Sequence, residues 1–158
     1  MKRKLLVSTV ILSMFMVACG DDYFFIKSKA FEDQQWAADT PKGFTFQVED
    51  TTSLYSFILN IRNTTDYEYQ NLYLFMTTTY PDQSSSRDTM EILLAKRSGE
   101  WLGKGSGYYR DNLVLFKKNV SLPEPGNYRI EFVQAMREDT LQGVDEIGLR
   151  ILQYNPQS

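Results

Sequence analysis

The feature that most constrains the fold is an alternation of apolar and polar residues with a period of two. It runs through four segments of the chain: residues 44–48, 55–61, 128–132 and 147–151. Ile58 is an exception to the pattern in the second segment. A period of two places one face of a β-strand in a core and the other face in solvent. The sequence therefore predicts several half-buried strands.

Three further segments, residues 72–79, 89–94 and 112–116, are apolar or β-branched on both faces. We expect such strands to be covered on both sides. A weaker strand is predicted over residues 30–37. Turn-forming residues separate all of these segments, and no segment has a convincing helical period.

Seven to nine short strands predict an all-β fold, an antiparallel β-sandwich that is jelly-roll-like and forms one domain. A closed up-and-down barrel is the alternative that the strand pattern leaves open. We assign residues 30–154 to the β-sandwich domain and residues 155–158 to a C-terminal tail.

The N-terminus has the composition of a secretory signal. Three basic residues precede an apolar run at residues 5–17, which is shorter than the roughly 20 residues that a membrane span needs. Residues 16–20, Met-Val-Ala-Cys-Gly, match a lipobox, where a signal peptidase cuts before a lipidated cysteine. Cys19 is the single cysteine of the chain and has no disulfide partner. The sequence predicts a signal peptide over residues 1–18, lipidation of Cys19, and a tether over residues 19–29.

Charge and composition exclude several classes of function. Removal of residues 1–18 leaves 140 of the 158 residues, with 14 basic residues against 20 acidic ones. Such a chain repels phosphate backbones, so no nucleic-acid partner is expected. The chain has no histidine, which removes Ser-His-Asp and Cys-His catalysis and every histidine-bearing metal site. We identify no catalytic residue, cofactor or metal site; a calcium site remains open, although no loop has EF-hand spacing.

The most unusual local sequence is the glycine-rich segment at residues 101–107, Trp-Leu-Gly-Lys-Gly-Ser-Gly. Its glycine spacing differs from that of a phosphate-binding loop, and no helix follows it. The glycines would let the backbone approach either its own core, with Trp101 as a plug, or a partner. Trp101, Lys104, Tyr108 and Tyr109 are the candidate interaction surface, for a protein or for stacking on a sugar ring. The alternative is that these aromatic side chains fill ordinary strand positions.

Seven stretches of the chain, together with the lipobox, resemble the gliding-motility lipoprotein GldH family: residues 60–63, 71–75, 80–82, 88–91, 99–107, 123–128 and 143–150. The stretches at 101–107 and 143–150 are the specific ones. The resemblance covers nearly the whole mature chain. It implies a cell-envelope lipoprotein that is needed for gliding and linked to the type IX secretion apparatus, and it implies no enzymatic activity.

Three threonines that follow an aspartate, Thr51, Thr89 and Thr140, resemble the O-glycosylation acceptor of the same bacterial group. Aspartate and threonine at a strand boundary are also ordinary turn chemistry. These threonines are therefore candidate modification sites only.

Three hypotheses of function follow from the sequence. The first is a non-catalytic interaction domain, anchored through Cys19 in the outer membrane on its periplasmic or surface face, that binds envelope proteins of the gliding and secretion machinery. The second is a carbohydrate-binding jelly roll that uses Trp101, Tyr108 and Tyr109. The third, a hydrolase built on two carboxylates, has no pair of carboxylates that the sequence places together.

Overall fold

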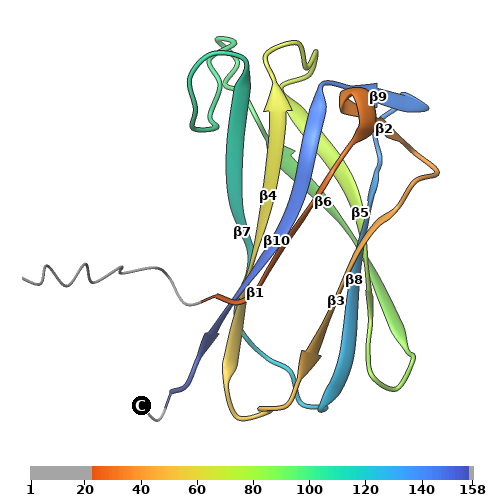
Figure 1. Cartoon of the computed structure of the whole chain (residues 1–158), viewed down its shortest axis with the longest axis vertical. Coiled ribbons are helices and arrows are strands. Elements are labelled where there is room, and N and C mark those ends of the chain that lie inside the picture. The colour runs from red at the N-terminus through yellow and green to blue at the C-terminus, as the bar shows by residue number, and fades with distance from the viewer. Residues whose placement is uncertain (1–22, 157–158) are drawn as a thin grey trace, which may run out of the picture.

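The computed structural model describes residues 23–156, so the predicted signal peptide and Cys19 lie outside the described residues. The described part consists almost entirely of strands (Figure 1). The elements, in chain order, are β1 (Tyr23–Ala30), the 3-10 turn η1 (Glu32–Gln34), β2 (Gln35–Ala37), β3 (Lys42–Val48), β4 (Leu54–Thr64), β5 (Asn71–Thr79), β6 (Ser85–Leu93), β7 (Tyr109–Ser121), β8 (Gly126–Gln134), β9 (Thr140–Gln142) and β10 (Val144–Tyr154). No helix within residues 23–156 is long and apolar enough to cross a membrane.

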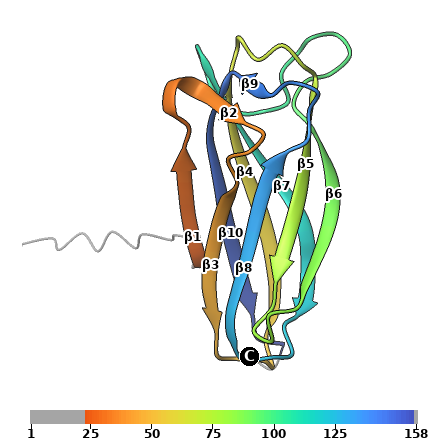
Figure 2. The ribbon, with the colours of Figure 1, turned by 90° about the vertical axis from the view of Figure 1, so that its right-hand side faces the viewer.

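Eight of the strands form two four-stranded antiparallel sheets that pack face to face (Figure 2). The order is β1-β10-β4-β7 in one sheet, here called sheet A, and β3-β8-β5-β6 in the other, here called sheet B. The chain crosses repeatedly between the sheets, which gives the strand order of a jelly roll. The predicted all-β sandwich of one domain is confirmed, and each sheet keeps two edges instead of closing into a barrel.

The core lies between the two sheets and follows the alternation read from the sequence. In β4, Tyr55, Phe57, Leu59 and Ile61 are buried and face sheet B. Fully burying side chains of this size stabilises the fold by about 1.5–3 kcal/mol each. The period-two pattern therefore identifies correctly which side of each strand is buried.

The domain begins earlier than predicted, because part of the expected tether is a strand. β1 pairs with β10 from Tyr23 opposite Leu152 to Ala30 opposite Glu146. Phe24 packs edge-on against Tyr55 with 5.3 Å between ring centroids. This apolar packing draws residues 23–29 into sheet A, and the tether can extend only over the residues before Tyr23.

The weak strand predicted over residues 30–37 is instead three short pieces: the end of β1, the turn η1 and the strand β2. β2 pairs with β9 in a small separate sheet at one end of the sandwich (Figure 1). We call this end, which also carries residues 94–108 between β6 and β7, the loop end. The opposite end, where β10 finishes at Tyr154, we call the tail end.

The prediction that three strands are covered on both faces is wrong. Within residues 23–156 each sheet is covered by the other sheet on its inner face only. Apolar side chains on the strands concerned are consequently exposed: Tyr73, Leu93, Leu113 and Leu115. Apolar residues on both faces identify these strands, but they do not show that the chain itself supplies the second cover.

Candidate functional site

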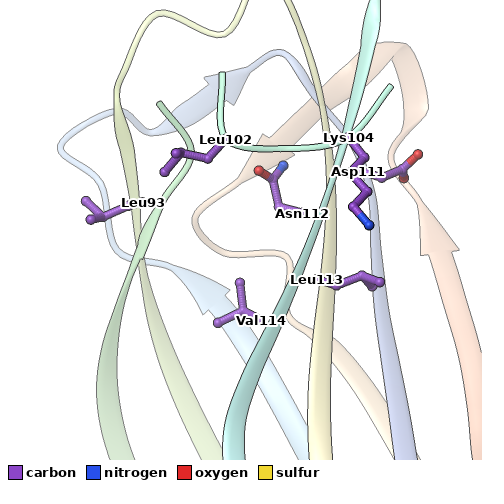
Figure 3. A pocket seen from close by; sticks show the side chains of 7 residues that line it. All are labelled: Leu93, Leu102, Lys104, Asp111, Asn112, Leu113 and Val114. Atoms are coloured by element: carbon purple, nitrogen blue, oxygen red, sulfur yellow. The ribbon is translucent and has the colours of Figure 1, made fainter. Parts of the chain in front are cut away.

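The open edge of the sandwich between β6 and β7 holds a surface hollow. β7 is the last strand of sheet A and β6 the last strand of sheet B. Between them, beneath residues 101–104, lies a groove of about 350 Å³ (Figure 3). It is lined by Leu93, Leu102, Lys104, Asp111, Asn112, Leu113 and Val114.

The wall of the groove is largely apolar. Leu93 is 61% exposed, Leu102 47% and Leu113 55%. Leu115, two residues beyond Leu113 on the same outward face of β7, is 51% exposed. Single exposed leucines are common on protein surfaces, but three of these leucines line one hollow, which makes the groove a candidate binding surface.

At the back of the groove lies the buried amide of Asn112. Its Nδ2 donates hydrogen bonds to the backbone oxygen of Ile61 at 3.0 Å and to Oδ1 of Asn63 at 2.8 Å. Its Oδ1, by contrast, is buried and has no hydrogen-bond partner among the described residues. These two acceptors fix the orientation of the Asn112 amide, so its oxygen is a buried hydrogen-bond acceptor without a partner among the described residues.

The glycine-rich segment that covers the groove is held by backbone hydrogen bonds at both ends. Lys104 and Asp111 exchange two bonds, N to O, of 2.8 and 2.7 Å. Leu102 donates to the backbone oxygen of Leu94 at 2.8 Å. Gly103 passes so close to Asn112 that a Cβ at position 103 would lie 2.6 Å from its Oδ1. The glycine therefore allows the segment to close over the asparagine.

The charges around the groove are unevenly paired. The Asp111 carboxylate accepts a hydrogen bond from Nε of Arg62 at 2.9 Å, and this bond raises the pKa of Arg62. Lys104 is exposed and has no ion-pair partner within residues 23–156. Among the described residues, the ammonium group of Lys104 is therefore a cation without an ion-pair partner at the loop end of the groove.

The structure does not gather the four predicted surface residues into one platform. Trp101 is half-buried and packs against the core, as expected for a plug, whereas Lys104 lines the groove. Tyr108 and Tyr109 are exposed outside the groove, with rings packed edge to face at 5.2 Å. The Tyr108 hydroxyl donates to Oδ2 of Asp66 at 2.8 Å, and this bond raises its pKa. A flat aromatic surface for a sugar would lack the ring of Trp101.

The three candidate threonines lie far apart in the fold. Thr51 is in the turn between β3 and β4, Thr89 is exposed on β6, and Thr140 is exposed at the start of β9. Their positions do not define a common site, and O-glycosylation stays a prediction.

The residues that sequence reasoning missed are the leucines and Asn112. Leu113 and Val114 lie in a stretch assigned to covered strands, so their apolar character was assigned to packing. What distinguishes them from ordinary covered residues is that β7 lies at the edge of its sheet. That position depends on the order of strands that are far apart in the sequence. Within residues 23–156 no three acidic or cysteine side chains are grouped as they would be to hold a metal ion.

Comparison with known proteins adds to this description. The profile of the GldH lipoprotein family matches residues 24–151. A gliding motility lipoprotein GldH homolog of Christiangramia forsetii is 35% identical over 124 residues, covering 74% of this chain and 76% of that protein. The gliding motility lipoprotein GldH of Flavobacterium johnsoniae is 25% identical over 151 residues, 91% of this chain and 93% of that protein.

Likeness to solved structures is distant. The VP2 subviral particle of infectious bursal disease virus aligns with a TM-score of 0.38 and 15% identity, covering 94% of this chain and 37% of that chain. A likeness at this level carries no argument about function.

The fold and the site together define a single-domain jelly-roll sandwich with a largely apolar groove at its open β6–β7 edge. The match over residues 24–151 places the chain in the GldH lipoprotein family. This family is linked to gliding motility and to the cell envelope, and it is not a known class of enzymes.

Proposed function

We propose that this protein is a non-catalytic interaction domain, anchored in the outer membrane through lipidated Cys19, that supports gliding motility and type IX secretion by binding envelope proteins. The single observation that carries the proposal is the uncovered apolar surface at the β6–β7 edge. Leu93, Leu102 and Leu113 are about half exposed or more in the isolated chain. Exposed apolar side chains around a groove are stabilised when a partner covers them.

The position of the tether supports this role. β1 begins at Tyr23, and only three residues, 20–22, separate that strand from the lipidated cysteine. The four steps along the chain from Cys19 to Tyr23 reach at most about 14 Å. Lys104 is level with Ala30 across the strands of sheet A, and Ala30 is seven residues along β1 from Tyr23, about 23 Å. The groove would therefore stand clear of the lipid and be accessible to other proteins.

The test is deletion of the gene, with assays of colony spreading and of secretion of type IX cargo. Complementation with the wild-type gene should restore both, whereas Cys19→Ala should leave the protein unlipidated and restore neither. Full spreading and secretion in the deletion strain would contradict the proposed role. Full complementation by Cys19→Ala would contradict the role of the anchor.

A further inference from the structure

We propose that β7 between Asp111 and Leu115 receives an extended segment of a partner protein as a fifth strand of sheet A, and that this segment is apolar in its middle and acidic at its ends. The inference deepens the proposed function, because it rests on a partner and specifies how that partner binds. The backbone, the side chains and the charges of the edge each support it.

The backbone of β7 provides an unused ladder. Asp111 directs its N–H and C=O away from β4, because both are bonded to Lys104. The pairing of β4 with β7 is regular from Asp111 to Leu115. In a regular strand every second residue points its backbone groups the same way. Leu113 and Leu115 therefore direct theirs toward the open edge, where no backbone partner lies among the described residues.

The half of β7 nearer the tail end is protected against strand addition, and the half nearer the loop end is not. The register with β4 shifts around Phe57, opposite Lys117, and Asn119 has a positive φ of 50°. Lys117 and Lys118 add charge there. Bulges, lysines and irregular backbone are the features that keep edge strands from pairing. The segment Leu113-Val114-Leu115 has none of them, so pairing is open in this stretch alone.

The side chains around this stretch fit an added strand. Successive side chains of such a strand would lie on alternate faces of sheet A. Those on the outer face would cover Leu113 and Leu115, and those on the inner face would enter the groove beside Leu93 and Leu102. Each of these exposed leucines would then have a contact.

The charges indicate which segment fits. Lys104 borders the open stretch on one side, and Lys117 and Lys118 border it on the other; none has an ion-pair partner within residues 23–156. Acidic residues at both ends of an apolar segment would pair with these cations. A second copy of this chain lacks the acidic ends, because its own β7 carries Arg110 just before the stretch and Lys117 and Lys118 just after it. Antiparallel pairing with such a copy would bring cations close to cations.

The test uses the lipidated mature protein in detergent and, as the probe, a displayed library of random short peptides. We expect enriched peptides to alternate apolar residues between acidic ends and to slow amide hydrogen exchange at Leu113 and Leu115. The double variant Leu113→Lys/Leu115→Lys should bind them about tenfold more weakly. The matched control is Ile26→Lys, which replaces a residue that is also 55% exposed, on the outer face of the same sheet, but at its other edge. It should bind the peptides like the wild type.

Several results would overturn the inference: no peptide enriched, peptides that bind both variants equally, protection of amides outside β7, or a dimer of the protein linked through β7. Melting curves of both variants would show whether each is folded. Complementation of the deletion strain separates this inference from the proposed function. If the deletion abolishes spreading and the double variant restores it, the edge is not the binding site although the function stands. If the deletion has no effect, the proposed function fails. The peptide-binding experiment then decides alone whether the β7 edge accepts an added strand.

Discussion

At the scale of single residues, Asp50 organises the turn between β3 and β4. Its carboxylate accepts hydrogen bonds from the Ser53 hydroxyl at 2.6 Å, from the Thr52 hydroxyl at 2.6 Å and from the Thr52 backbone N–H at 2.8 Å. These bonds, chiefly the one from Ser53, hold the pKa of Asp50 well below its ordinary value of 3.8. The folded state therefore favours the ionised carboxylate of Asp50.

This depressed pKa predicts a dependence of stability on pH. A carboxyl whose pKa is lower in the folded than in the unfolded state contributes stability above the unfolded value and loses it as the pH falls through the folded one. We expect Asp50→Asn to melt at a lower temperature than the wild type at pH 7, and the difference to shrink from about pH 4 downward. Thermal melts between neutral and acidic pH would measure it. Asp139→Asn, at an exposed carboxylate with no side-chain hydrogen bond within residues 23–156, is the control at neutral pH. A difference that stays constant with pH would contradict the assignment.

Gly143, between β9 and β10, has a positive φ of 82° and a crowded surrounding. A Cβ there would lie 2.9 Å from the backbone nitrogen of Tyr67. Gly99 has a similar φ of 85°, but no atom lies within 4 Å of the position that its Cβ would take.

We expect Gly99→Ala to lower the free energy of unfolding by about 1 kcal/mol, from backbone strain alone. Gly143→Ala should cost roughly twice as much or more, because the backbone of Tyr67 must also move. Urea unfolding would compare the two, and equal losses would show that contact with Tyr67 adds no cost.

At the scale of elements, the small sheet of β2 and β9 closes the core at the loop end. Trp36 on β2 is fully buried, and its ring lies 4.6 Å from that of Phe31. Its Nε1 donates to the backbone oxygen of Thr40 at 3.0 Å. A pair of three-residue strands makes few backbone hydrogen bonds. The buried indole of Trp36 therefore contributes most of what holds the small sheet against the core.

We therefore expect Trp36→Ala to lower the free energy of unfolding by about 3–5 kcal/mol, which is typical for removing a large aromatic side chain from a core. Trp36→Phe should lose less, because a ring still packs against Phe31 although the hydrogen bond to Thr40 is absent. Denaturant unfolding followed by circular dichroism would measure both. A small loss in Trp36→Ala would mean that the sheet at the loop end folds independently of this side chain.

The elements also show how far the sequence could predict the structure. The alternation in β3, β4, β8 and β10 is local, so the strands and their buried faces could be read from it. β1 was missed because Tyr23 and Phe24 follow directly on a signal segment and are joined to the sheet by pairing with β10, at the other end of the chain. The candidate site was only partly predictable. Lys104 was recognised from its glycine-rich surroundings, whereas the role of Leu113 depends on which strands end each sheet.

At the scale of the whole molecule, the short tether predicts how the domain stands on the membrane. With the lipid on Cys19, the tail end, where Tyr154 is exposed, would face the bilayer and the loop end would face away from it. Cys19 is the only cysteine, and acylation would leave it unreactive toward thiol dyes. A single introduced cysteine could therefore be labelled cleanly.

We expect a dye on Tyr154→Cys to be quenched by quencher-bearing lipids in reconstituted vesicles. A dye on Ser106→Cys, in the exposed segment of the loop end, should be quenched little. The distance along the strands, about 23 Å from Tyr23 to the level of Ala30, accounts for the difference. Equal quenching at both positions would mean that the domain lies on its side or has no fixed orientation.

The antiparallel pairing of β1 with β10 has a mechanical consequence in a protein that is held by a lipid. β1 runs from Tyr23 toward the loop end, and from Phe25 onward its partners follow in register from Ile151 to Glu146. If the bilayer holds the N-terminus while a partner pulls at the loop end, the force runs along β1, at right angles to its hydrogen bonds. The ladder would then be loaded in shear, with all its bonds resisting together, rather than peeled open one bond at a time.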